Sequence, residues 1–138
     1  MVAAHAAQAY ARIGLETGVA AASPQRLIVM LYDGALAAIA DARAHMRDGR
    51  TAQKGRAIGK AISIVDEGLK AALDPSQGSS IAQQLMELYD YIGRLLLQGN
   101  LGNDAARLDE AARLLSELRG AWATLAERQS APALASNY

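Results

Sequence analysis

The chain has 138 residues, enough for one domain with a hydrophobic core, and 51% of its residues are hydrophobic. Fourteen basic and fourteen acidic side chains give a net charge of zero, which excludes an overall basic field that would attract nucleic acid or anionic lipid. The absence of cysteine excludes disulfides, thiolate metal ligands and a cysteine nucleophile.

The first predicted helix runs from about Pro24 to Met46. Ser23 is a suitable N-cap with proline after it, and Gly49 is a suitable terminator. Its apolar stripe consists of Ile28, Leu31, Ala35, Ile39, Ala42 and Met46. The run from Leu27 to Tyr32 is apolar nearly all round, so this helix either buries more than one face or keeps one for a partner.

The second predicted helix spans about Ala52 to Leu73. Asp74-Pro75 ends it, and residues 75–79 have the composition of a loop. One face of this helix carries Ile58, Ala61, Ile62, Val65, Leu69 and Leu73.

The third predicted helix begins at Ser80, with Gln83 at the spacing of a capping box, and residues 99–102 are predicted to form a turn. Its stripe consists of Ile81, Leu85, Leu88, Ile92 and Leu95, widened by Tyr89, Leu96 and Leu97. The fourth helix is predicted from about Asp104 to Ala126, with Asn103 as its N-cap. Its apolar residues repeat with a period near 3.5 and are Leu108, Leu115, Leu118, Trp122 and Leu125.

Helices of about 22 residues are roughly 33 Å long, and short connections make neighbouring helices antiparallel. We therefore expect an all-α fold, an antiparallel up-down four-helix bundle over residues 23–126. We expect residues 1–22 to form a short mobile N-terminal segment, partly ordered as a cap over the bundle. Residues 127–138 are predicted to be a flexible tail.

No grouping of side chains suggests catalysis. His5 and His45 lie far apart, and neither has a Glu or a second His at the helical spacing of metal ligands. The adjacent acidic pairs at 66–67 and 109–110 do not face each other on a helix, whereas acid–base catalysis needs positioned groups in a pocket. No apolar run reaches the length of about 18 residues that a membrane span needs. We expect a binding protein with no enzymatic activity, no cofactor and no metal.

Three motifs in this chain resemble those of the flagellar export chaperone family FliS. The first comprises Ala9-Tyr10, Val19, Ala22-Ser23-Pro24 and the run LIVMLYDGAL at 27–36. The second is LYDYIGRLL at 88–96, with its paired tyrosines, and the third comprises Asn103-Asp104, Leu108, Glu110, Leu118-Arg119 and Ala121-Trp122. The motifs occur in the family's order, and the resemblance covers about residues 8–126.

The resemblance implies a four-helix-bundle chaperone of the bacterial cytosol that binds the disordered C-terminal segment of flagellin. In the family this segment wraps the bundle and becomes partly helical, which prevents premature polymerisation, and the complex docks on the membrane export gate. The expected partners are therefore the flagellin C-terminal segment and a flagellar export-gate protein. We expect no nucleic acid, no stable membrane insertion, and a free protein that is a monomer or a weak dimer.

The residues expected to bind the partner are Tyr10, Ile13, Leu27, Leu31, Tyr32, Tyr89, Tyr91 and Leu96. Core packing is the alternative for the leucines, whereas a tyrosine brings a hydroxyl to an apolar surface, as interface tyrosines often do. By the resemblance, the segment around Tyr10 packs into an apolar groove and is displaced by flagellin. Tyr10 is then either a displaceable lid or a direct contact.

Two other functions remain as alternatives. The first is a self-assembling helical-bundle structural or adaptor protein, in which the apolar excess is an oligomer interface. The second is a ligand-binding or enzymatic bundle with a site in its core. The lack of inward-facing Glu-x-x-His pairs in the sequence counts against the second.

Overall fold

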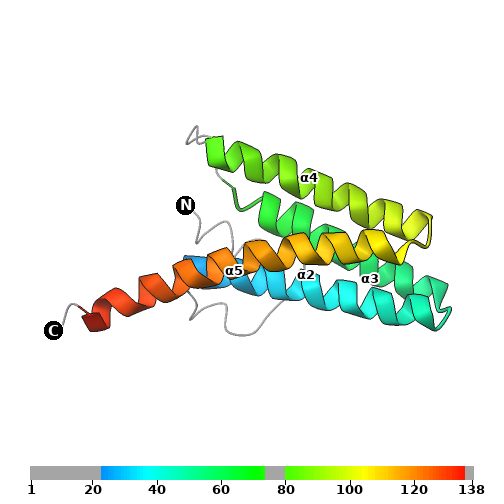
Figure 1. Ribbon diagram of the computed structural model, residues 1–138, viewed down its shortest axis with the longest axis horizontal. Helices are drawn as coiled ribbons and strands as arrows, with labels where there is room; N and C mark the ends of the chain where they lie inside the picture. Colours follow the sequence, from blue (N-terminus) through cyan, green and yellow to red (C-terminus); the bar gives the residue numbers. More distant parts are fainter. Residues whose placement is uncertain (1–22, 74–79, 136–138) are drawn as a thin grey trace.

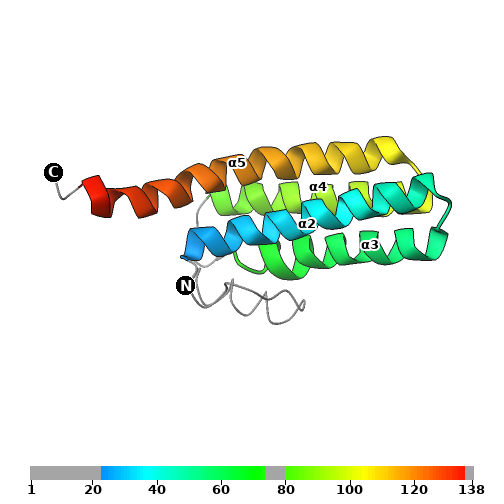
Figure 2. The same ribbon diagram turned by 90° about the horizontal axis from the view of Figure 1, so that it is seen from below.

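The computed structural model describes residues 23–73 and 80–135, with side-chain surroundings up to residue 128. Its helices are α2 (Pro24–Arg47), α3 (Thr51–Ser63), a π-helical continuation η1 (Ile64–Lys70), α4 (Ser80–Leu101) and α5 (Ala105–Ala135). They lie along one axis and reverse direction at each connection (Figures 1 and 2). The predicted all-α, antiparallel four-helix fold is confirmed. The predictions for residues 1–22, which include Tyr10 and Ile13, lie outside the described residues.

Both predicted ends of α2 are confirmed. The Oγ of Ser23 accepts a hydrogen bond of 3.1 Å from the backbone N–H of Arg26, and Pro24 occupies the first helical position. The helix ends at Arg47, and Gly49 follows with a φ of +71°, a conformation that favours glycine.

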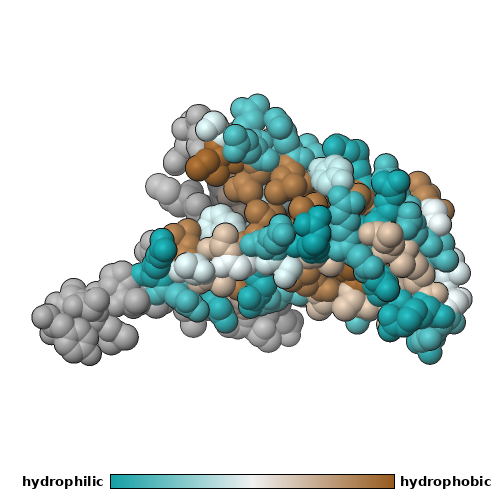
Figure 3. Space-filling view, viewed as in Figure 1, coloured by the Kyte–Doolittle hydropathy of each residue, from teal (hydrophilic) through white to brown (hydrophobic). Residues whose placement is uncertain are grey.

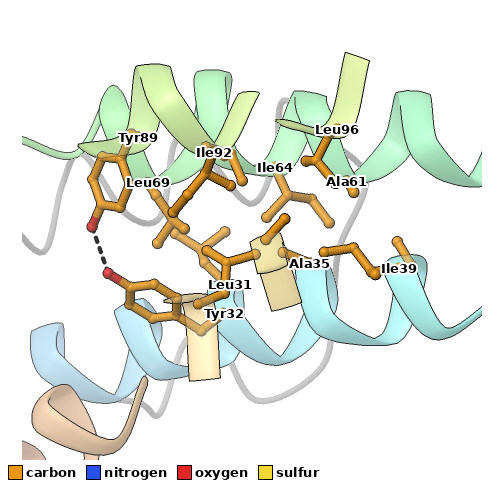
Figure 4. Close-up of a cluster of buried hydrophobic side chains, with 14 of the residues drawn as sticks. Leu31, Tyr32, Ala35, Ile39, Ala61, Ile64, Leu69, Tyr89, Ile92 and Leu96 are labelled. Atoms are coloured by element: carbon orange, nitrogen blue, oxygen red, sulfur yellow. Dashed lines mark hydrogen bonds between the residues drawn. The ribbon is translucent and has the colours of Figure 1, made fainter. Parts of the chain in front are cut away.

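Helix α2 supplies much of the core. It packs against α3 with η1 on one side and against α5 on the other, and α4 packs against η1, α3 and α5. Beside the predicted stripe it buries Leu27, Val29 and Tyr32, so more than one of its faces is covered. Figure 4 shows Leu31 and Tyr32 of α2 pointing toward residues of α4 and η1.

The second helix changes its hydrogen-bonding pattern at Ile64. A π-helical turn bonds residue i to i+5 and therefore holds one residue more than an α-helical turn, which rotates the faces that follow. Ile64 and Ala72 are buried, whereas Ile62 and Leu73, assigned to the predicted stripe, are half-buried. The sequence prediction assumed a constant α-helical period and missed this change.

The predicted turn at residues 99–102 was wrong, because α4 continues to Leu101. The predicted N-cap of α5 was wrong as well. Asp104 caps the helix through its Oδ1, which accepts a 3.0 Å hydrogen bond from the backbone N–H of Ala106. Asn103 has a φ of 51° and uses its side chain for another contact.

That contact comes from Lys54 of α3, the buried charged residue of the described core. Its Nζ donates to the Oδ1 of Asn103 at 3.0 Å and to the backbone carbonyl of Asn100 at 3.1 Å. Because a buried ammonium group needs hydrogen-bond partners, these bonds hold the start of α3 against the α4–α5 connection.

Helix α5 also extends beyond its predicted end at Ala126, to Ala135. Glu127 and Arg128 are good helix formers, so local propensity favours this continuation. The tail predicted from residue 127 therefore overlaps the last part of the helix.

Candidate partner-binding surface

Helices α4 and α5 approach closely near the connection that joins them. A Cβ added at Gly99 of α4 would lie 2.7 Å from the Cδ2 of Leu108 and 3.3 Å from the backbone oxygen of Asp104. Only glycine fits without a shift of its neighbours. Toward its Ser80 end, α4 diverges from α5 (Figure 1). The first half of α4 is therefore not closed over α5.

Polar contacts identify the faces of α4 and α5 that look toward each other. The hydroxyl of Tyr91 donates to the Oε2 of Glu110 at 2.5 Å, and the Nη1 of Arg107 donates to the Oε1 of Gln98 at 2.7 Å. The bond to the Glu110 carboxylate raises the pKa of Tyr91 above its usual value. Residues one or two helical turns from these contacts share the same faces.

A different flank of α5 faces α2. Arg43 and Asp33 of α2 form ion pairs with Asp109 and Arg119 of α5. These pairs indicate which flank of α5 faces α2, and the flank about one third of a turn away is directed toward α4.

An apolar surface results where α4 and α5 diverge. Figure 3 shows hydrophobic side chains gathered in a hollow between the two helices at this end. Five half-buried residues of these two helices pack against the core: Leu85, Leu88, Leu114, Leu118 and Trp122. Leu125 of α5 is 37% exposed. We define the α4–α5 apolar surface by these residues: Leu85, Leu88, Leu114, Leu118, Trp122 and Leu125.

A buried pair of tyrosines lies beside this surface. The hydroxyls of Tyr32 and Tyr89 are 2.5 Å apart and join α2 to α4 (Figure 4). Burial raises the pKa of both phenols, that of Tyr89 to about 12, and a hydrogen bond with Trp122 acts in the opposite direction on Tyr32. Both phenols are therefore protonated at physiological pH, and one hydroxyl donates a hydrogen bond to the other within the core.

The structure buries most of the residues predicted to bind the partner. Leu27, Leu31, Tyr32, Tyr89 and Leu96 are all in the core, whereas Tyr91 is 37% exposed. In this conformation, a partner reaches the buried side chains only if neighbouring helices move. Their burial fits the core alternative, and their role in binding stays a prediction.

Sequence reasoning assigned the residues of the α4–α5 apolar surface to core stripes, except Leu114, which it placed in no stripe. One signal was present in the sequence. The apolar period of the fourth helix continues to Leu125. The third helix diverges from the fourth, so it covers only part of this apolar stripe. The close packing at Gly99, from which the two helices diverge, is not revealed by any periodicity.

Within the described part of the chain, no three or more His, Asp or Glu side chains lie close enough to bind a metal ion together. No helix in the same residues has both the length and the hydropathy of a membrane span.

The chain is similar to known proteins over nearly its whole length. The family model described as "Flagellar protein FliS" matches residues 6–129. The Flagellar secretion chaperone FliS of Salmonella typhimurium is 46% identical over 130 residues, which cover 94% of this chain and 96% of that protein. The protein of the same name from Escherichia coli is 42% identical, with 88% and 90% covered. Flagellar secretion chaperone FliSB of Pseudomonas aeruginosa is 39% identical, with 88% and 96% covered.

Proposed function

Because the chain belongs to the FliS family, we propose that it is a cytoplasmic export chaperone that binds the disordered C-terminal segment of flagellin on the α4–α5 apolar surface. FliS is a family of chaperones and not of enzymes. A bound flagellin segment is withheld from filament contacts, which prevents premature polymerisation. The loaded chaperone then delivers flagellin to a flagellar export-gate protein.

The observation that carries this proposal is the exposed apolar surface where α4 leaves α5. Its α5 side runs from Leu114 to Leu125, about 17 Å at 1.5 Å per residue. That length matches about three turns of an amphipathic helix, which binds a groove through apolar side chains at helical spacing. A disordered segment that folds on this surface offsets its ordering entropy by burying apolar area.

Calorimetry and circular dichroism test the proposal directly. We expect a flagellin C-terminal peptide of roughly 40 residues to bind one-to-one, with a negative heat-capacity change and a gain of helix. Leu125→Asp should weaken binding at least about tenfold, because it places a charge within the apolar contact. Leu101→Asp is the matched control, since Leu101 is 79% exposed and lies outside the surface.

The two parts of the proposal fail differently. A folded wild-type protein that gives neither heat nor helix gain with the peptide would overturn flagellin binding. Equal dissociation constants for the Leu125→Asp and Leu101→Asp variants would overturn the placement on the α4–α5 apolar surface. A dimer that persists on dilution and ignores flagellin would instead support self-assembly through the exposed apolar side chains.

Tyr10 and Ile13 enter the proposal as parts of a segment that competes with flagellin. Deleting residues 1–17 should then speed flagellin association, because the competing state is removed. Stopped-flow fluorescence measures the rate. An unchanged rate contradicts a lid, and a slower rate indicates that Tyr10 contacts flagellin directly. The buried Leu27, Leu31, Tyr32, Tyr89 and Leu96 would join the site only when α4 is displaced.

A further inference from the structure

Trp122 is the aromatic residue of the α4–α5 apolar surface and the one tryptophan of the chain. It lies four residues after Leu118 and three before Leu125, so the three side chains share one face of α5. Tryptophan is enriched among the residues that dominate binding energy, because its large ring buries much apolar area and its N–H takes a hydrogen bond. Trp122 therefore has the position and the chemistry of an anchor for a bound segment.

The indole of Trp122 is bonded to the core beside it. A hydrogen bond joins its side chain to that of Tyr32. An indole N–H only donates, whereas a phenol hydroxyl both donates and accepts, so Trp122 is the donor and the Tyr32 oxygen is the acceptor. This direction agrees with the effect of the bond, because a donor to the phenol oxygen lowers the pKa of Tyr32.

The acceptor of this bond is itself held from two sides. Tyr32 is fully buried, and its hydroxyl lies 2.5 Å from that of Tyr89 on α4 (Figure 4). The next residue, Asp33, forms an ion pair with Arg119, which lies three positions before Trp122 on α5. A fixed phenol of α2 therefore contacts both α4 and α5 at the edge of the α4–α5 apolar surface.

Tyr89 is held less completely than Tyr32. Its ring lines a hollow of ≈ 340 Å³ between η1 and α4, together with Leu97, which is 49% exposed. Tyr32 is the central member of the three side chains, with one bond to Tyr89 and one to Trp122. Removing the hydroxyl of Tyr32 breaks both bonds, whereas removing that of Tyr89 breaks one.

We propose that Tyr32 is a positioning residue for client binding, whose hydroxyl holds the Trp122 indole in the orientation that receives the apolar client segment. Trp122 contacts the client, and Tyr32 acts through Trp122 while it remains in the core. This inference rests on the proposed function, because it assigns roles within the same binding surface.

Positioning contributes to affinity by reducing what the binding step must order. An indole bonded to a fixed acceptor already has its orientation in the free protein, so it loses little rotamer freedom when the client packs on it. Without the bond, the indole is ordered only when the client binds. The cost of immobilising one such side chain corresponds to a loss of affinity of about two- to tenfold.

The test uses the full-length protein and the flagellin C-terminal peptide, with Trp122 as the intrinsic fluorophore. Tyr32→Phe and Tyr89→Phe both lose the bond between the two hydroxyls, but only Tyr32→Phe loses the acceptor of the indole. We expect Tyr32→Phe to lower the fluorescence anisotropy of Trp122 in the free protein and to weaken client binding about two- to tenfold. Tyr89→Phe, the matched comparison, should have the smaller effect on both. A loss of stability alone would not separate the two variants in this way.

Trp122→Phe completes a double-mutant cycle, because it keeps an aromatic ring and removes the N–H donor. In the Trp122→Phe background, Tyr32→Phe should weaken client binding no more than Tyr89→Phe does, since the bond through which it acts is already absent.

Three results would overturn the inference. Tyr32→Phe and Tyr89→Phe could weaken client binding equally, or the anisotropy of Trp122 could stay unchanged in folded Tyr32→Phe. Tyr32→Phe could also weaken binding as much in the Trp122→Phe background as in the wild type, in which case its effect does not pass through the indole. If the wild-type protein does not bind the flagellin peptide at all, the proposed function fails, while the anisotropy of the free variants still decides whether Tyr32 holds the indole.

Discussion

Replacing Gly99 by alanine tests the close approach from which α4 and α5 diverge. The new Cβ would lie 2.7 Å from the Cδ2 of Leu108, and Leu108 is fully buried and has little room to move. Overpacking of this kind typically costs about 1–3 kcal/mol. A glycine-to-alanine change inside a helix also contributes about 0.8–1 kcal/mol of stability. The net expectation for Gly99→Ala is a loss of between zero and about 2 kcal/mol.

Gly93→Ala is the matched comparison, because Gly93 lies on the same helix with open space above it. This variant should gain about 0.8–1 kcal/mol, since the helix propensity term acts without a clash. The propensity term cancels between the variants, so their difference of about 1–3 kcal/mol isolates the packing cost. With a urea m-value of about 1–3 kcal/mol/M, unfolding followed by circular dichroism should separate the midpoints by about 1 M.

A double-mutant cycle identifies the atoms responsible. Leu108→Ala by itself should cost about 2–5 kcal/mol as a buried truncation. In the Leu108→Ala background, Gly99→Ala should be less destabilising than in the wild-type background, because the contacts with the Leu108 side chain are gone and only the 3.3 Å contact with the backbone oxygen of Asp104 remains. The reasoning is refuted if Gly99→Ala in the wild-type background raises the urea midpoint as much as Gly93→Ala does.

Three further predictions concern the core and its polar contacts. Burial raises the pKa of Tyr32 and Tyr89, that of Tyr89 to about 12. The folded state therefore keeps the protons of these phenols at a pH near 10.0, where the unfolded state releases them. The free energy of unfolding should be highest below pH 10.0 and should fall as the pH rises above it. Ultraviolet titration that ionises every tyrosine near pH 10.0 with the fold intact would contradict this. Tyr89→Phe removes one hydroxyl of the pair and should lower the free energy of unfolding by about 0.5–1.5 kcal/mol in urea titration, with no change if the bond contributes nothing. Lys54→Met removes the bonds to the α4–α5 connection and should cost about 1–3 kcal/mol by thermal unfolding, whereas the exposed Lys60→Met should stay within about 0.5 kcal/mol.

The sequence predicted the helices well where the signals are local. Ser23 and Gly49 bound α2 as predicted, because capping depends on a few neighbouring residues. The α4–α5 connection was predicted less well. Gly99 looks like a turn residue but lies in α4, where its missing side chain makes room for Leu108. The two roles of glycine cannot be separated without knowledge of the facing helix.

Burial of the predicted binding residues shows a second limit. Tyr89 and Tyr91 are two positions apart in one motif, yet the first is 2% exposed and bonds to Tyr32, whereas the second is 37% exposed and bonds to Glu110. Successive helical residues point about 100° apart, so the rotation of α4 in the bundle decides which tyrosine enters the core. Periodicity indicates that a stripe exists but not which of its edges is covered.

By itself, the sequence determined the all-α class, the order of the helices, most of the core of α2 and the membership of the FliS family. Each of these depends on residue types at short spacings along the chain or on similarity along its length. Only the tertiary structure decided that α4 diverges from α5, that η1 is π-helical, and that apolar side chains remain accessible on both flanks of α4. The physical reason is that accessibility is a property of facing surfaces, and those surfaces are set by contacts such as that between Gly99 and Leu108.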